Sequence, residues 1–234
     1  MSGIMKGKRG LVMGVANDHS IAWGIAKTLA DHGAELAFTY QGENFGRRVK
    51  PLADSVGADL LLPCDVEDID TVDAVFDTLK EKWGTIDFLV HAIAFSDKSE
   101  LTGRFLNTSR ANFKNSMDIS AYSFIEVARR AHPMMVEHGG TLLTLSYMGS
   151  TRVTPNYNVM GVAKAVLEAA VTGLEKHETP LAWRPCLALL SRLLTCDRGR
   201  MHSHAATSTA AELPAPTTPC ALVTSSHLDG SCRW

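Results

Sequence analysis

Two tyrosines and a lysine are the residues of this chain best suited to acid–base chemistry. Tyr147 lies ten residues before Tyr157, and Lys164 lies seven residues after Tyr157. Seven residues is close to two helical turns, so Tyr157 and Lys164 would lie within about 20° of one helix face. A free tyrosine is a poor acid at neutral pH, and a nearby ammonium would lower its pKa. An isolated pair is more often an aromatic helix start followed by a solvated lysine, so its interpretation depends on the surrounding elements.

Those elements alternate between short apolar runs and amphipathic stretches. The alternation predicts an α/β fold, a Rossmann-like doubly wound parallel sheet with helices on both faces. Ligands bind such sheets outside the carboxyl ends of the strands, near the point where the strand order reverses. The expected strands are 9–15, 35–40, 59–64, 87–91 and 141–146, and the expected helices are 21–31, 45–55, 68–83, 112–137 and 157–171.

The first expected strand leads into a loop that suits a pyrophosphate. Gly14 follows this strand, and Ser20 and Ile21 stand where the next helix begins. A glycine lets the backbone approach a phosphate, and a helix N-terminus offers free amides and the positive end of its dipole. The segment is not a GxGxxG motif, because the second glycine is missing and the loop is longer. A plain strand–turn–helix connection is the alternative.

The second and third strands end in polar residues that could contact an adenosine. Gln41 stands where NAD enzymes usually carry an acidic residue, and it can bond a ribose without repelling a 2′-phosphate. Arg47 and Arg48 could bind such a phosphate, although a solvated helix face is the favoured interpretation. We therefore predict NADH as the cofactor, with NADPH less favoured. Asp65 and its neighbour Val66 lie where an adenine edge would bind; a turn carboxylate is the alternative for Asp65.

The fourth strand ends in His91, Ala92, Ile93 and Ala94, whose small side chains suit a flat ring packed against the backbone. His91 itself is interpreted as a core histidine with satisfied hydrogen bonds, because no metal-binding partners occur at a suitable spacing.

Composition excludes several classes of function. The 234 residues carry a net charge of −2 without a basic stripe, so no nucleic-acid partner is expected. No run approaches 18 consecutive apolar residues, and the N-terminus lacks the pattern of a signal peptide. Five cysteines without a CxxC pair indicate neither a disulfide framework nor zinc, and no other metal is expected. We therefore expect a cytoplasmic protein without a membrane partner.

These motifs together resemble the bacterial NADH-dependent enoyl-[acyl-carrier-protein] reductases, a divergent branch of the short-chain dehydrogenase/reductase superfamily. Ordinary members of the superfamily have a Tyr-x3-Lys pair and a serine thirteen residues before the tyrosine, whereas this chain has Gly161 and Thr144 at those positions. The resemblance covers about residues 3–171. It is carried by Gly14-x5-Ser20-Ile21-Ala22-x-Gly24, Tyr40-Gln41, Cys64-Asp65-Val66, His91 to Phe95, and Tyr147-x9-Tyr157-x6-Lys164.

The resemblance implies reduction of trans-2-enoyl thioesters, carried by acyl carrier protein, in fatty-acid synthesis. It implies Tyr147 and Tyr157 as the catalytic pair, Lys164 on the nicotinamide ribose, and Ser96 at the acyl substrate. It also implies a homotetramer built through the helices equivalent to 112–137 and 157–171. A carbonyl reductase of the same superfamily and a non-catalytic dinucleotide-binding remnant are the alternatives. The NADH-binding residues implied are Gly14, Ser20, Ile21, Gln41, Asp65, Val66, Ile93 and Lys164.

The chain departs from the family near residue 172. The family continues with two more strands, a loop over the cofactor and a helix over the acyl chain, none of which the sequence indicates here. Residues 172–234 hold four of the five cysteines and many prolines. Three explanations for this change of composition are a frameshifted end, a divergent end and a genuine extension. We therefore expect an incomplete reductase domain over 1–171, a partly disordered tail over 172–234, and impaired activity.

Overall fold

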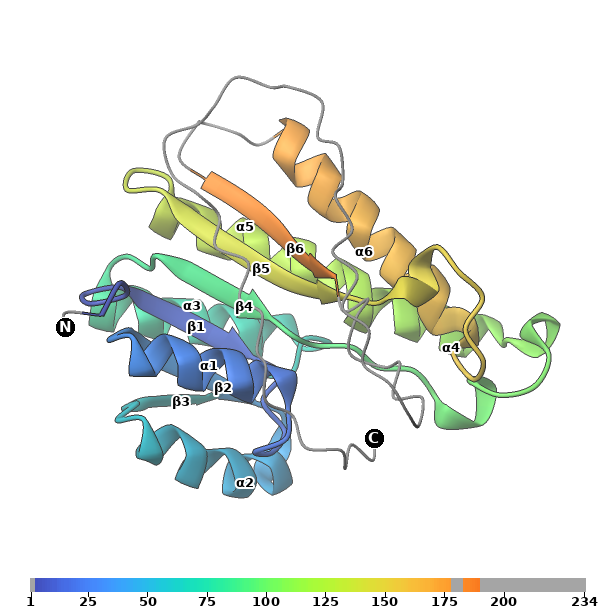
Figure 1. The fold of residues 1–234 in the computed structure, drawn as a ribbon, viewed down its shortest axis with the longest axis horizontal. Coiled ribbons are helices and arrows are strands. Elements are labelled where there is room, and N and C mark those ends of the chain that lie inside the picture. Colours follow the sequence, from blue (N-terminus) through green and yellow to red (C-terminus); the bar gives the residue numbers. More distant parts are fainter. Residues whose placement is uncertain (1–2, 178–182, 190–234) are drawn as a thin grey trace, which may run out of the picture. The chain divides into compact units, whose positions relative to one another are not determined.

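A computed structural model describes residues 3–177 and 183–189 of the chain. The strands in this part form one parallel sheet in the order β3-β2-β1-β4-β5-β6 (Figure 1). The order therefore reverses between β1 and β4, which is the switch point of a doubly wound sheet. The strands are β1 (Arg9–Met13), β2 (Glu35–Tyr40), β3 (Leu60–Pro63), β4 (Phe88–His91), β5 (Gly140–Ser146) and β6 (Trp183–Leu189).

Helices connect these strands and cover both faces of the sheet. The α-helices are α1 (Ile21–Asp31), α2 (Gly42–Ser55), α3 (Ile69–Trp83), α4 (Arg110–Met117), α5 (Ser123–Met135) and α6 (Asn158–His177). Short 3₁₀ turns η1 (Lys98–Glu100), η2 (Phe105–Asn107) and η4 (Met148–Ser150) lie in the loops, and a π-helical turn, η3 (Asp118–Tyr122), joins α4 to α5. The Rossmann-like doubly wound sheet predicted from the sequence is confirmed, with shifts only at the ends of the five predicted strands.

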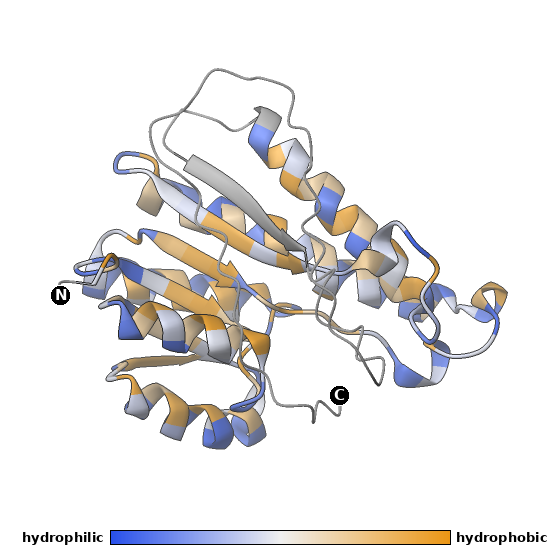
Figure 2. Cartoon of the chain, in the orientation of Figure 1, coloured by the Kyte–Doolittle hydropathy of each residue, from blue (hydrophilic) through white to orange (hydrophobic). Residues whose placement is uncertain are grey.

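Alternating side chains of the central strands bury two cores. Leu11 and Met13 of β1 pack in one core with apolar residues of α3, α5 and α6, whereas Val12 packs in the other with residues of α1 and α2. This alternation follows from the two-residue period of a strand. Figure 2 shows apolar residues concentrated along the strands and hydrophilic residues on the outer faces of α1 and α2.

The sequence predicted one helix over 112–137, and the structure corrects that prediction. The segment divides into α4, the π-helical turn η3, and α5. At this turn the Ser120 hydroxyl accepts a hydrogen bond from the Phe95 amide at 3.0 Å. π-Turns occur frequently at functional sites, and this one ties the α4–α5 segment to the loop that follows β4.

The sequence predicted no strand after the helix that carries Lys164, and the structure corrects that prediction. β6 pairs in parallel with β5 along its whole length, from Gly140↔Trp183 to Ser146↔Leu189. Pro185 made a strand unexpected here, because proline has no backbone N–H to donate to a neighbouring strand. β6 is the last strand of the described sheet, where a missing N–H is tolerated more readily. The expectations of a missing seventh strand and a disordered tail concern residues 190–234, which lie outside the described residues. The domain boundary at residues 171 and 172 stays a prediction, and α6 runs across it.

None of the helices described here is both long enough and apolar enough to cross a membrane.

Candidate functional site

The predicted site residues follow the carboxyl ends of neighbouring strands. Met13 pairs with His91, and His91 pairs with Thr144, so the segments after β1, β4 and β5 emerge side by side at the switch point. On the other side of β1, Tyr40 pairs with Pro63, which brings the residues after β2 and β3 together. The strand register alone therefore places these loops in a row. We call the end that holds Gln41 and Asp65 the adenosine side, and the end that holds Tyr147, Tyr157 and Lys164 the tyrosine side.

Gly14 brings the end of β1 against the segment after β4. Its φ is +94°, and a Cβ at this position would lie only 2.1 Å from the carbonyl oxygen of Ala92. The Ala92 amide donates to the carbonyl of Met13 at 3.1 Å, which holds the two segments together. Both the backbone angle and this close approach require glycine.

Ser20 closes the loop after Gly14 and leaves the helix start open. Its Oγ accepts hydrogen bonds from the backbone amides of Ala16 at 3.0 Å and Asn17 at 2.9 Å. The same side chain caps no amide of α1. The first amides of a helix have no intrahelical acceptor, so the start of α1, from Ile21 onward, can receive an anionic oxygen.

Gln41 and Asp65 form a polar pair on the adenosine side. The Gln41 amide Nε2 donates to Asp65 Oδ2 at 2.9 Å, and Asp65 Oδ1 accepts from the Glu67 amide at 3.1 Å. Gln41 is exposed, and Asp65 is partly exposed. The structure thus brings together two residues that the sequence placed on separate strands, and it leaves them accessible to a ligand. Val66 and Ile93, by contrast, are partly buried and pack against one core.

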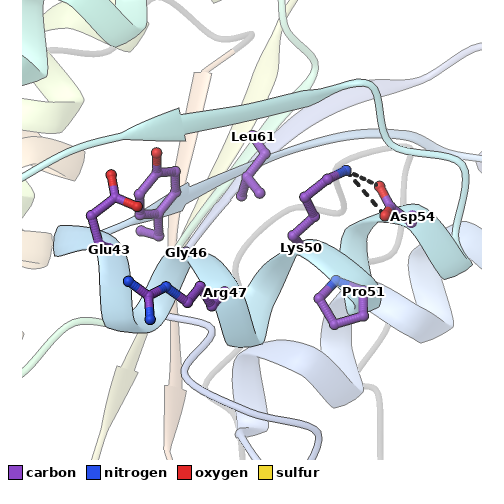
Figure 3. A pocket seen from close by; sticks show the side chains of 8 residues that line it. Glu43, Gly46, Arg47, Lys50, Pro51, Asp54 and Leu61 are labelled. Atoms are coloured by element: carbon purple, nitrogen blue, oxygen red, sulfur yellow. Dashed lines mark hydrogen bonds and ion pairs between the residues drawn. The ribbon is translucent and has the colours of Figure 1, made fainter.

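The two arginines after β2 lie on α2. The Arg48 guanidinium lies over the Phe45 ring, 5.9 Å from its centroid. Arg47 lines a shallow cavity of about 450 Å³ beside Lys50, which forms an ion pair with Asp54 (Figure 3). This cavity is lined by residues of α2 together with Tyr40 of β2 and Leu61 of β3, and neither Tyr147 nor Tyr157 lines it.

Tyr147 and Tyr157, hereafter the tyrosine pair, pack against each other edge to face. Their ring centroids are 4.9 Å apart, with the planes at 64°. Tyr147 follows β5, and Tyr157 immediately precedes α6, with η4 between them. A Cβ at Gly149 would lie 2.5 Å from the Tyr157 ring and 3.4 Å from the Tyr147 ring. Glycine in η4 is therefore needed for the two rings to meet.

Gly161 explains why this chain lacks the common Tyr-x3-Lys spacing. A Cβ on Gly161 would lie 2.6 Å from the carbonyl oxygen of Gly149. The first turn of α6 thus packs directly onto the backbone of η4, and no larger side chain fits at that position without a shift. Lys164, about one turn further along α6, is the lysine whose Nζ reaches the end of β5.

Lys164 is a buried cation with unused hydrogen-bonding capacity. It is 7% exposed, and its Nζ donates to the Leu145 carbonyl oxygen at 2.8 Å. An ammonium has three donors, so this bond leaves donors that fit a diol. Burial lowers the pKa of Lys164 to about 8, and the charge of Glu168 opposes that shift. Lys164 therefore stays mostly protonated at neutral pH.

Lys164 does not lower the pKa of Tyr157 in this structure. Burial raises the pKa of Tyr157 to about 12, and Tyr147 adds a smaller increase. The phenolate would lose its hydration in this position, and the lysine does not compensate for that loss. Tyr157 is thus a neutral hydroxyl that can donate a hydrogen bond throughout the physiological pH range.

His91 is a core histidine, as predicted. It is fully buried, with Nε2 2.9 Å from Ser123 Oγ and Nδ1 3.3 Å from Thr144 Oγ1. Burial lowers the pKa of His91 to about 3, and the charge of Lys164 lowers it further. The imidazole is therefore neutral and connects β4 to β5 and α5.

Ser96 lies in a buried network rather than on an open surface. It is 8% exposed, and its Oγ accepts from Ser116 Oγ at 2.9 Å and from Asn112 Nδ2 at 3.2 Å. Its predicted contact with an acyl substrate stays a prediction.

Sequence reasoning did not single out Asn112, Ser116, Asn158 or Glu168. Asn158 Nδ2 donates to the carbonyl oxygens of Glu100 at 3.0 Å and Thr102 at 3.3 Å, which holds the β4–α4 loop beside the tyrosine pair. The sequence signals that could have found them are four-residue spacings on a helix, of Asn112 from Ser116 and of Lys164 from Glu168.

The chain matches one family model and is similar in sequence to several named proteins. The family model described as "Enoyl-(Acyl carrier protein) reductase" matches residues 14–176. "Enoyl-[acyl-carrier-protein] reductase [NADH] 2" of Rhizobium meliloti (strain 1021) is 68% identical over 171 residues, covering 73% of this chain and 63% of the relative. "Enoyl-[acyl-carrier-protein] reductase [NADH] FabI" of Rickettsia bellii is 46% identical over 214 residues, covering 88% of this chain and 81% of the relative.

The chain is also similar in sequence and in fold to solved structures. The crystal structure of FabI from Candidatus Liberibacter asiaticus is 53% identical with a TM-score of 0.78, covering 80% of this chain and 72% of that one. The enzyme from Anaplasma phagocytophilum, solved in complex with NAD, is 55% identical with a TM-score of 0.73, covering 75% of this chain and 67% of that one. The chain spans 63% and 62% of the lengths of its two Rhizobium meliloti relatives.

Proposed function

Because the chain belongs to the enoyl-(acyl carrier protein) reductase family, we propose that it reduces trans-2-enoyl-[acyl-carrier-protein] thioesters to acyl thioesters with NADH, in cytoplasmic fatty-acid synthesis. The observation that carries this proposal is the contact between Tyr147 and Tyr157, whose ring centroids are 4.9 Å apart, at the end of β5, where the buried Lys164 donates to the Leu145 carbonyl oxygen. The close approach of Gly161 to η4 favours enoyl over carbonyl reduction, because it excludes the lysine position of ordinary carbonyl reductases.

Three features of the chain fit NADH. Lys164 retains donors for the ribose hydroxyls, Gly14 permits a close backbone approach, and the start of α1 offers amides to the pyrophosphate. The exposed pair Gln41 and Asp65 fits an adenosine, and the Asp65 carboxylate disfavours the extra phosphate of NADPH. The residues proposed to line the cofactor are Gly14, Ser20, Ile21, Gln41, Asp65, Val66, Ile93 and Lys164.

The roles of the tyrosines follow from the charge that the reaction creates. Bound NADH would supply the hydride. Reduction at the β-carbon of an enoyl thioester builds negative charge on the thioester oxygen, and a positioned donor stabilises that charge. Tyr157 keeps its proton up to about pH 12, so its hydroxyl can donate to this oxygen. The Tyr147 ring positions Tyr157, and Lys164 binds the cofactor rather than acidifying the tyrosine.

Ser96 is proposed as the residue that meets the acyl substrate. Its hydroxyl is already bonded to Ser116 and Asn112. The contact would therefore use the main chain of Ser96.

We also propose that the chain forms a homotetramer through α4, η3, α5 and α6. Phe113, Tyr122 and Val166 on these elements are 41%, 46% and 44% exposed and line one cavity of about 610 Å³. Large exposed apolar groups of this kind mark an interaction surface. Light scattering of the full chain should give a tetramer, and Val166→Glu should yield smaller species; a wild-type monomer at micromolar concentration would contradict the proposal.

The experiment that tests the activity uses the purified full chain with NADH and a trans-2-enoyl thioester. Turnover is followed by the loss of nicotinamide absorbance, with a ketone assayed in parallel and NADH binding measured separately by fluorescence. We expect reduction of the enoyl thioester, at the low rate that the departure from the family after residue 171 predicts, and no reduction of the ketone. Reduction of the ketone alone would indicate a carbonyl reductase, and NADH binding without any turnover would indicate a binding-only remnant. Absence of NADH binding would contradict the proposal altogether.

A further inference from the structure

Glu168 is a carboxylate that the proposed reaction does not use. It lies four residues after Lys164 on α6, and its Oε1 accepts a short hydrogen bond from the Ser146 hydroxyl. Ser146 is the last residue of β5 and is fully buried, whereas Glu168 is partly buried. The carboxylate is therefore held by the sheet rather than left to rotate in solvent.

Lys164 and Glu168 hold two consecutive residues of β5. Lys164 Nζ binds the carbonyl oxygen of Leu145, and Glu168 binds the side chain of Ser146. Residues four apart on a helix are neighbours on its surface, so the carboxylate lies on the same side of α6 as the ammonium. This arrangement fixes the first half of α6 against the end of β5, next to Tyr147.

A buried ammonium needs a nearby negative charge. Burial of an unpaired ion is costly, and such a group tends to lose its charge instead. In the described part of the chain, Glu168 is the one charge that raises the pKa of Lys164. Two other titratable groups on the tyrosine side of the site supply no negative charge near neutral pH. His91, whose pKa is about 3, is neutral, and Tyr157, whose pKa is about 12, keeps its proton.

We propose that Glu168 is a positioning residue which, fixed by Ser146, keeps Lys164 protonated and in place and thereby sets the upper pH limit of NADH binding. The inference rests on the proposed function, because it assigns Lys164 to the cofactor. Glu168 itself touches neither the cofactor nor the substrate in this scheme.

The decisive variant is Glu168→Gln. Glutamine keeps the length of the side chain and an oxygen that accepts from Ser146, but it removes the charge. NADH affinity of the full chain would be measured by fluorescence at several pH values from 6.5 to 9. We expect wild-type affinity to fall above about pH 8, as Lys164 loses its proton. Glu168→Gln should bind within about twofold of wild type at pH 6.5 and roughly fivefold more weakly at pH 8.5.

Two further variants separate the charge from the fold. Ser146→Ala keeps the carboxylate but frees it, so its affinity should fall in the same direction by a smaller factor. Glu81→Gln makes the same chemical change at an exposed position of α3, where the side chain is 76% exposed, and should leave the pH profile unchanged. A Glu168→Gln profile that coincides with wild type, or one that is weaker by the same factor at every pH, would overturn the inference.

A second measurement keeps the inference independent of cofactor binding. The Lys164 side chain would be titrated by NMR in ¹³C-lysine-labelled chain without NADH, with Lys164→Met to assign the signal. Glu168→Gln should lower the pKa of Lys164, and an unchanged titration would overturn the inference even if the wild-type chain binds NADH. If the wild-type chain binds no NADH but the titration shifts, the proposed function fails while the role of Glu168 in keeping Lys164 charged stands.

Discussion

The two ends of the candidate cofactor site differ in how they hold their polar groups. On the adenosine side, Gln41 is exposed and bonds to a partly exposed Asp65. On the tyrosine side, Lys164 is 7% exposed, and His91 and Ser146 are fully buried. Water solvates the polar groups of the adenosine side in the free protein. The buried polar groups of the tyrosine side instead depend on one another for their hydrogen bonds.

This difference predicts at which positions a substitution will have a large effect on NADH affinity or on stability. Removing a hydrogen bond from an exposed group costs little, because water replaces the lost partner. Removing a partner from a buried group leaves the other partner unsatisfied at the full cost of its desolvation. We therefore expect large effects on the tyrosine side and small ones on the adenosine side.

The largest effect should come from Lys164→Met. The variant removes a buried cation whose donors would bind the ribose, so NADH affinity should fall about 100-fold or more. Thermal stability should fall as well, because methionine leaves the Leu145 carbonyl oxygen without the Lys164 donor and Glu168 without the neighbouring ammonium. Fluorescence titration and thermal unfolding check both statements. The matched control is Lys80→Met, which changes an exposed lysine of α3; near-wild-type NADH affinity in Lys164→Met would remove the basis of the comparison.

The next effect should come from Gly161→Ala. The added methyl group would meet the Gly149 carbonyl oxygen at 2.6 Å and push η4 away from α6. We expect the free energy of unfolding to fall by about 1–3 kcal/mol, the usual cost of overpacking. Urea unfolding followed by tryptophan fluorescence measures it.

Gly173→Ala is the control on the same helix, since nothing lies within 4 Å of its added Cβ. Alanine has the higher helix propensity, so this variant should be neutral or more stable. Equal destabilisation by the two substitutions would contradict the close approach at Gly161.

A smaller effect should appear in the acid stability of the chain through His91. Its pKa is about 3 in the folded chain and near 6.5 when solvated, so the unfolded chain binds the extra proton first as the pH falls. The free energy of unfolding should therefore fall by about 1 kcal/mol between pH 6.5 and 5.5 from this residue alone. His91→Gln should remove that part of the slope, measured by urea unfolding at each pH. His19→Gln, at an exposed histidine, should keep it; an unchanged slope in His91→Gln would show that the buried histidine is not responsible.

The smallest effect is expected from Gln41→Ala. The variant removes an exposed hydrogen bond to Asp65, so NADH affinity should fall only about two- to fivefold. Stability should stay unchanged. If this variant weakened NADH binding as strongly as Lys164→Met, the contrast between the two ends of the site would be wrong.

Much of the site could be predicted because its signals are local. Gly14, Gln41, Asp65 and the tyrosine pair each follow a strand, and apolar runs of strand length locate those ends. The strand register then brings them together, as a parallel doubly wound sheet requires. The interruption of the 112–137 helix and the presence of β6 were missed, since a π-turn and an edge strand with a proline have no periodic signal.

The pairings that decide the chemistry could not be predicted. Ser146 and Glu168 are 22 residues apart, and His91 and Thr144 are 53 apart. Gly161 was noticed as a departure from a motif, but its reason is an oxygen atom of Gly149 on another element.

The sequence by itself determined the order of the first five strands and the residue types that reach the switch point, because periodicity and turn chemistry act over a few residues. The tertiary structure alone decided the protonation of these groups. Tyr157 keeps its proton instead of losing it to the influence of Lys164, and the charge of Glu168 opposes the lowering of the Lys164 pKa by burial. The physical reason is that desolvation and charge pairing depend on all the atoms packed around a group, and those come from segments far apart in the chain.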